Sequence, residues 1–303
     1  MRQTAKNAWI SLKTDRDDWV VIDHGGLEHC KSVGKLSQYP RTVLFIGREA
    51  KRKARRATFP FNNHNKREKD SFVNLVRDSL ISECERPILF SELNLIYPPN
   101  PKTGLPDGCK KYRLEWANGA EQRSAANEVY DALIAKVVLQ FYDVVCLFAD
   151  DFKNHEQVAL HVMRWVQKAH RSTMLNRPRL VVFSSSPFTL DQFPGCSSLF
   201  SNIRTSTHAQ SSELSYTAQY LRLRDTILTE LDVMQKAKTG SRILFETRHL
   251  TALTDKALEH FSAATSLDLA KAAKEFNPVG PGFASHLEEL IRVQKAQITS
   301  PPV

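Results

Sequence analysis

The sequence predicts an α/β fold in which a mostly parallel sheet carries helices on both faces. Three short apolar runs, at 41–46, 143–149 and 179–183, have the length and composition of buried strands. Helical patterns lie between and after these runs, and such an alternation is typical of parallel sheets with crossover helices. The 303 residues are enough for one large domain or two small ones.

The elements around the first run follow from local patterns. Short strands are predicted at 9–12 and 19–22, and the segment 48–57, rich in Ala, Lys and Arg, predicts a helix. The apolar residues of 72–80 recur at helical spacing after Asp70, which is a suitable N-cap, so we expect a second helix there.

The middle of the chain predicts a hairpin and two helices. Segments 87–97 and 111–116 read as strands joined by a loop rich in Pro and Gly, and together they predict the hairpin. Helices are expected at 125–141 and 155–170, on either side of the second buried strand.

The pattern weakens after Ser184. We expect a long loop at 184–212, an edge strand at 242–245, and helices at 214–236, 249–262 and 284–296. The chain is therefore divided into an N-terminal segment (1–39), an α/β core (40–212) and a helical C-terminal extension (213–303).

Composition limits the classes of protein that fit. No apolar run approaches the length of a transmembrane helix, and the first residues lack the apolar centre of a signal peptide. The five cysteines are far apart and form no CxxC pair, which favours free thiols in a reducing, cytoplasmic compartment over a zinc site.

Residues 43–54 hold the most informative motif. A buried strand runs into Gly47, and Lys53 stands where the lysine of a phosphate-binding P-loop, G-x-x-x-x-G-K-[ST], is expected. Arg52 replaces the second glycine, and Ala54 replaces the hydroxyl residue that holds magnesium. The alternative is that Lys53 is one more lysine in a basic run. The phosphate or nucleotide ligands expected from this segment are Gly47, Arg48, Lys51, Arg52 and Lys53.

Two acidic residues are candidates for a metal site. Asp150 and Asp151 end a predicted buried strand, and ligands of open α/β sheets bind beyond the carboxyl ends of strands. An ordinary N-cap for the following helix is the alternative. The serines at 184–186 suggest nucleophiles, but no spacing of His and Asp supports a triad, so we expect a polar loop. A metal site at His24, His29 and Cys30 lacks a fourth ligand.

The net charge of +9 is concentrated in the segment 48–69. Such a block favours an anionic partner, whether phosphate, nucleic acid or lipid headgroup, and the alternative is a solvated helix face.

The segment 40–190 resembles a Ras-type G domain of the P-loop class. The predicted hairpin 87–116 stands where such domains place their second and third strands. Residues 116–122 track the family's D-x-x-G-Q-E stretch, with Trp116 replacing the Asp and Gly119 as the motif glycine. Residues 184–187 replace the base-reading N-K-x-D motif. The resemblance implies a three-layer P-loop fold and a purine nucleotide with magnesium, yet the residues that would support hydrolysis are absent.

The whole chain also resembles the region upstream of patatin-like phospholipase domains in some filamentous fungal proteins, through 43–60 and 249–290. No G-x-S-x-G nucleophile motif of such a lipase occurs here. Our first hypothesis is therefore a non-hydrolysing, pseudo-GTPase-like module that regulates or recruits a protein partner. The alternatives are a divergent NTPase that uses Asp150 or Asp151 for magnesium, and a nucleic-acid-binding protein that uses 48–69.

Overall fold

The computed structural model describes most of the chain between residues 7 and 272. The described residues are 7–15, 18–30, 38–64, 72–79, 85–94, 108–117, 122–169, 177–187, 195–207, 215–241, 243–268 and 272. Several predictions lie wholly or partly outside them: the N-cap Asp70, the loop 98–108 except Gly108, the motif glycine Gly119 and the last helix at 284–296.

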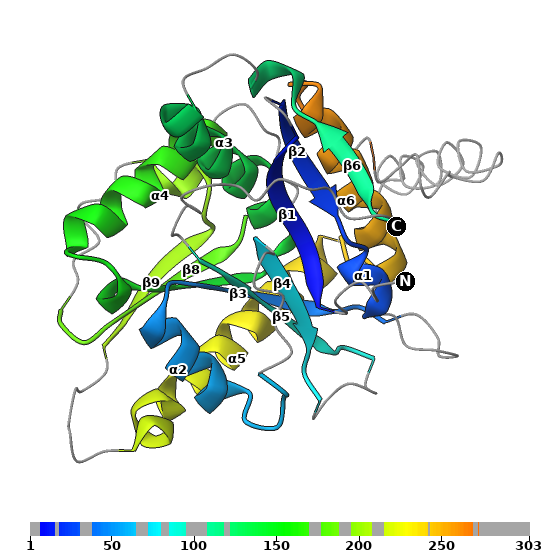
Figure 1. Cartoon of the computed structure of the whole chain (residues 1–303). Coiled ribbons are helices and arrows are strands. Elements are labelled where there is room, and N and C mark those ends of the chain that lie inside the picture. The colour runs from blue at the N-terminus through cyan, green and yellow to red at the C-terminus, as the bar shows by residue number, and fades with distance from the viewer. Residues whose placement is uncertain are drawn as a thin grey trace, which may run out of the picture.

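Nine strands and six α-helices make up the described fold (Figure 1). The strands are β1 (Ala8–Asp15), β2 (Asp18–Asp23), β3 (Arg41–Ile46), β4 (Val73–Arg77), β5 (Ile88–Leu93), β6 (Lys110–Arg113), β7 (Val144–Phe148), β8 (Arg179–Ser184) and β9 (Asn202–Thr207). The helices are α1 (Gly26–His29), α2 (Glu49–Thr58), α3 (Gln122–Lys136), α4 (His155–Ala169), α5 (Tyr216–Gly240) and α6 (Thr247–Ser262).

All nine strands join one mixed sheet in the order β6-β2-β1-β4-β5-β3-β7-β8-β9. The run from β5 to β9 is parallel, and the run from β6 to β5 is antiparallel. The α/β class is confirmed, but the sheet is mixed rather than mostly parallel. A link as short as the two residues between β1 and β2 permits only antiparallel pairing.

The helix predicted at 72–80 is wrong, because Val73–Arg77 forms β4. β4 is hydrogen-bonded on both sides, to β1 and to β5, and its first three residues are buried. Over five residues the apolar positions fit a helical and an extended spacing almost equally well. The two neighbouring strands, which local pattern does not reveal, decide in favour of the strand.

The hairpin predicted at 87–116 is also wrong. Both edges of β5 are already taken, by β3 and by β4, so no edge is left for β6. β6 pairs instead with β2, and Lys110 lies opposite Asp23. Sequential strands often pair, but here β2, β1 and β4 lie between β6 and β5 in the sheet.

The loop predicted at 184–212 contains β9, which pairs in parallel with β8. β9 lies at the edge of the sheet and its residues are half-buried or exposed, so it lacks the apolar run that predicted the inner strands. The edge strand predicted at 242–245 is not formed by the three of its residues that are described, Ile243, Leu244 and Phe245.

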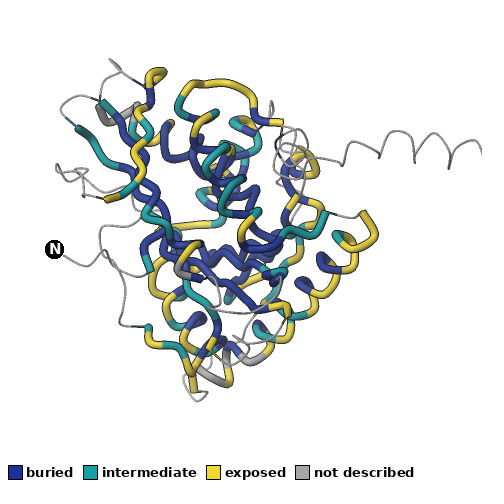
Figure 2. The backbone as a smooth tube through the Cα atoms, turned by 90° about the vertical axis from the view of Figure 1, so that its right-hand side faces the viewer, coloured by how far each residue is buried: buried dark blue, intermediate teal, exposed yellow. Residues whose placement is uncertain are grey.

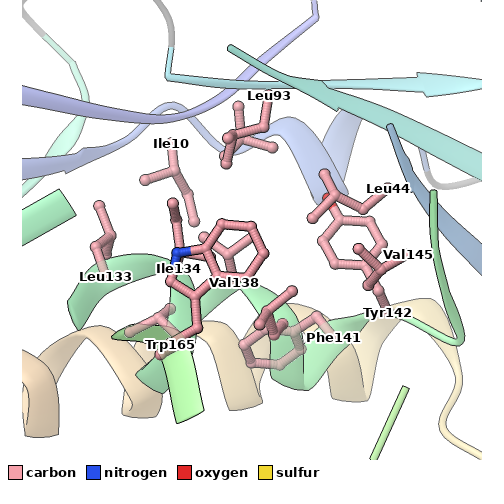
Figure 3. Packing of buried hydrophobic residues seen from close by; sticks show 14 of the residues in the cluster. Ile10, Leu44, Leu93, Leu133, Ile134, Val138, Phe141, Tyr142, Val145 and Trp165 are labelled. Atoms are coloured by element: carbon pink, nitrogen blue, oxygen red, sulfur yellow. The ribbon is translucent and has the colours of Figure 1, made fainter. Parts of the chain in front are cut away.

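Helices cover both faces of the sheet. Leu44 on β3 belongs to a core with α3, α4 and α6, whereas Phe45 belongs to a second core with α2 and α5. This alternation follows from the two-residue period of a strand. Figure 2 shows the buried strands between helices that expose their outer sides. In Figure 3, Trp165 packs among Leu133, Ile134 and Val138; its Nε1–H donates to Asp131 Oδ1 at 3.1 Å.

β1 and β2, from the predicted N-terminal segment, extend the same sheet as the core strands. The boundaries predicted after residues 39 and 212 stay predictions. Within the described residues, no helix has both the length and the apolar character needed to cross a membrane.

Candidate functional site

The connection between β3 and α2 consists of Gly47 and Arg48 alone. Arg52 and Lys53 therefore lie inside α2, not in an open loop that could wrap around a phosphate. Arg48 and Arg52 are exposed, Lys53 is half-buried, and Arg52 Nη2 donates to Glu49 Oε2 at 2.6 Å. The residues that match the P-loop motif in sequence thus form a two-residue turn followed by the first turns of a helix.

The carboxylate of Asp151 lies at the amino-terminal end of α2. Its Oδ2 accepts hydrogen bonds from the backbone N–H groups of Arg48 (2.5 Å) and Lys51 (3.0 Å). Its Oδ1 accepts one from the N–H of Ala50 at 2.8 Å. Gly47 has a φ of 151°, and a Cβ built there would lie 2.4 Å from Asp151 Oδ2. The close approach of the carboxylate therefore requires a glycine.

These N–H groups are the donors that a helix N-terminus offers to an anion. The helix dipole favours negative charge at the same place. Asp151 reaches it from the end of β7, because β7 is the parallel neighbour of β3. The carboxylate thus stands where a bound phosphate would be held, and an external anion would have to displace it.

The side chain of Lys51 is buried, and its ammonium group binds other residues of the interior. Its Nζ donates to the carbonyl oxygen of Leu93 at 3.2 Å and to Asn94 Oδ1, and it lies 3.6 Å from Glu92 Oε2. Arg55 Nη1 donates to Glu92 Oε1 at 2.5 Å. Lys51 and Arg55 therefore both bind the buried carboxylate of Glu92, and neither side chain is directed to the surface where a ligand would bind.

Asp150 and Asp151 bind different elements. The carboxylate of Asp150 accepts hydrogen bonds from the backbone N–H of Ser185, at 3.0 and 3.1 Å, and from its Oγ at 2.8 Å. The first turn of α4 is closed by Asn154, whose Oδ1 accepts from the N–H of Gln157 at 3.0 Å. Asp151 thus caps α2 rather than the helix that follows it in sequence.

No group of three His, Cys, Asp or Glu side chains arranged to hold a metal occurs in the described part of the chain. His24 Nε2 lies 2.8 Å from Ser11 Oγ, and its Nδ1 lies 3.5 Å from Cys109 Sγ. Burial raises the pKa of the Cys30 thiol to about 12, which disfavours the thiolate that a metal needs.

Ser184, the last residue of β8, and Ser186 lie close to a histidine that the sequence did not connect with them. His155 Nε2 lies 3.4 Å from Ser184 Oγ and 3.2 Å from Ser186 Oγ. His155 begins α4, and the parallel pairing of β7 with β8 brings the two loops together. Only that pairing, which crosses about thirty residues of sequence, could have revealed the contact.

Two further positions of the resemblance have structural roles, and one lies outside the described residues. Trp116 Nε1–H donates to the carbonyl oxygen of Phe261 on α6 at 2.8 Å, and Trp116 follows β6 at the edge of the sheet, so it does not join the residues expected to form the site. Ala54 is fully buried in the core between α2 and the sheet. Gly119 is not among the described residues.

The carboxyl ends of β3, β7 and β8 thus gather a helix N-terminus, two carboxylates and a Ser–His cluster. The described contacts tie the two carboxylates to the chain's own N–H groups and to Ser185. Such an arrangement holds three loops together. Comparison with protein-family models and with curated proteins finds no match for this chain.

Proposed function

We propose that this chain is a non-hydrolysing, pseudo-GTPase-like module that regulates or recruits another protein. The observation that carries the proposal is the carboxylate of Asp151, which takes the N–H groups of Arg48, Ala50 and Lys51. Because this carboxylate belongs to the same chain, its effective concentration at the site is high, and a nucleotide phosphate must compete with it. The module keeps the strand, turn and helix of a phosphate-binding site, but the carboxylate of Asp151 occupies the position of the anion.

The order of elements supports the resemblance to a G domain. α2 is followed by the antiparallel pair β4–β5, which takes the place of the family's second and third strands at 73–93 instead of 87–116. β7 and β8 then continue the parallel run beside β3. The three-layer, Ras-type arrangement of this half of the sheet is part of the proposal.

The chemistry of three positions supports the loss of hydrolysis. Ala54 carries no oxygen for magnesium and is buried. Trp116 follows β6 at the opposite side of the sheet from β7 and β8, and its indole N–H is engaged with α6, so it supplies no group that orients a metal-bound water beside α2. Asp150 is engaged with Ser185, so its use as a magnesium ligand would require these hydrogen bonds to break.

Thermal unfolding with GTP, GDP and ATP, each with and without magnesium, tests the proposal. A ligand at one hundred times its dissociation constant stabilises a protein by about 2.7 kcal/mol. We expect no such rise in melting temperature with any nucleotide, and no release of phosphate. A magnesium-dependent rise, with turnover that Lys53→Ala abolishes, would instead establish the divergent NTPase.

A further inference from the structure

The cations of α2 are divided between two sides of the helix. Lys51 and Arg55 are buried and bind Glu92. Arg48, just before the helix, and Arg52 and Arg56 within it are exposed. We refer to Arg48, Arg52 and Arg56 as the arginine row. The two sides differ because α2 buries one face against the sheet, where Ala54 is fully enclosed.

The arginine row has a regular spacing. Its members are four residues apart in sequence, and one helical turn separates neighbours by about 6 Å along the axis. Each guanidinium can donate two hydrogen bonds to one phosphate, which makes arginine well suited to phosphate recognition. Successive phosphates of an extended nucleic-acid strand are separated by a similar distance, so one strand can contact all three side chains.

Little negative charge lies within the row. Glu49 is the single acidic residue of α2, and both it and its partner Arg52 are exposed in a 2.6 Å ion pair. Such exposed pairs contribute at most about 1 kcal/mol, so a phosphate can replace the carboxylate. The neighbouring helix α5 adds Arg222 and Arg224 against Asp225, and Arg224 donates to the carbonyl oxygen of Thr58.

An exposed aromatic ring follows the arginine row. The side chain of Phe61 is in the turn after α2 and is 69% exposed. The turn is anchored on both sides of it: Phe59 stacks on Phe90 with ring centroids 4.1 Å apart, and Asn62 Nδ2 donates to the carbonyl oxygen of Arg77 at 2.7 Å. Phe61 is thus held at the surface by a fixed turn, in a position suited to stacking with a base.

We propose that the arginine row and Phe61 form a binding surface for single-stranded nucleic acid. A row of exposed arginines, followed in the next turn by an exposed aromatic ring, offers the cationic and stacking groups that bind single strands. An anionic membrane fits less well, because the apolar face of α2 is buried in the core and is not free to enter a lipid surface. The proposal uses the guanidinium groups of the arginine row, whereas the Asp151 contact uses the backbone N–H of Arg48, so it does not depend on the proposed pseudo-GTPase role.

Fluorescence anisotropy with a labelled oligouridylate of about twelve nucleotides tests the proposal across a range of salt concentrations. For single strands the logarithm of the binding constant falls against the logarithm of the salt concentration with a slope of about −0.7 per neutralised phosphate. Replacing Arg48, Arg52 and Arg56 together by Gln should therefore reduce the slope by about 2. The control replaces three exposed cations on other elements, Lys111, Arg113 and Lys236, by Gln.

The control variant should change the slope by less than half as much, because it removes the same charge at a distance from the row. Phe61→Leu keeps an apolar side chain without the aromatic face, and it should weaken binding roughly fivefold or more at every salt concentration. Far-ultraviolet circular dichroism checks that each variant is folded. Equal losses in the two triple variants would overturn the proposal, as would binding to phosphatidylserine vesicles without binding to the oligonucleotide.

Discussion

Buried ionisable groups have different surroundings in the parallel and antiparallel parts of the sheet. Beside the parallel strands, carboxylates have specific partners: Glu92 lies between Lys51 and Arg55, and Asp151 caps α2. In the antiparallel part, burial itself has the largest effect. It raises the pKa of Asp23 to about 6 and lowers the pKa of His24 to about 4.

The difference has a physical origin. The parallel neighbours β3 and β7 are each followed by a helix, so the N–H groups at the start of α2 can donate to a carboxylate at the end of β7. β2 is also followed by a helix, but α1 has only four residues, and Asp23 accepts a hydrogen bond there from the N–H of the N-cap residue Gly25 at 2.9 Å. Substituting the partnered carboxylates Glu92 and Asp151 should therefore lower the free energy of unfolding, whereas the contribution of the desolvated Asp23 should depend on pH.

The largest effect is expected for Glu92→Gln. Without its charge, Lys51 and Arg55 remain buried close to each other, and breaking a buried ion pair costs about 3–5 kcal/mol. Urea denaturation measures the free energy of unfolding. The matched control is Glu49→Gln, which breaks an exposed pair with Arg52 and should cost less than about 1 kcal/mol. Equal losses of unfolding free energy in the two variants would show that the buried ion pairs of Glu92 stabilise the fold no more than the exposed pair does.

A somewhat smaller loss is expected for Asp151→Ala. The change removes hydrogen bonds to three N–H groups at the start of α2 and should cost about 2–3 kcal/mol in the free energy of unfolding. Asp150→Ala, next to it in sequence, should cost less, because the side chain of Asp150 is exposed whereas that of Asp151 is half-buried.

The same Asp151→Ala variant tests whether the start of α2 can bind an anion. Inorganic phosphate should raise the melting temperature of the variant more than that of the unsubstituted chain, since the three N–H groups are no longer occupied. Identical responses to phosphate would mean that the carboxylate does not stand in for a bound anion.

The smallest effect concerns Asp23 and pH. Its pKa is raised from 3.8 to about 6 in the folded chain, so its contribution to stability is complete below pH 3.8 and is lost as pH rises through about 6. Between about pH 4.5 and 6.5 this loss amounts to about 2 kcal/mol. His24 acts in the opposite direction, since its lowered pKa favours the folded state above pH 6.5.

Comparing the original chain with Asp23→Asn separates the two groups. His24 is present in both, so its contribution cancels in the difference, and the variant should gain about 2 kcal/mol relative to the original chain over that pH range. Denaturation curves at several pH values give this difference directly. A difference that does not vary with pH would contradict the assignment of the shift to Asp23.

Local patterns were sufficient for the inner strands and most helices. The apolar run at 41–46 is β3, the segment 48–57 with its many good helix formers makes up most of α2, and the apolar spacing of 155–170 correctly predicts α4. The patterns failed at β4 and β9. A five-residue strand is ambiguous in spacing, and an edge strand need not be apolar.

The sequence by itself determined which residues of the candidate site exist: a glycine after a buried strand, a basic helix, and two aspartates after another strand. The tertiary structure alone decided what they do. Asp151 meets the N–H of Arg48 across about one hundred residues of sequence because β3 and β7 pair in parallel. Lys51 turns inward because the buried Glu92 needs a cation. Such contacts depend on strand order, which is a property of the whole sheet and of no single segment.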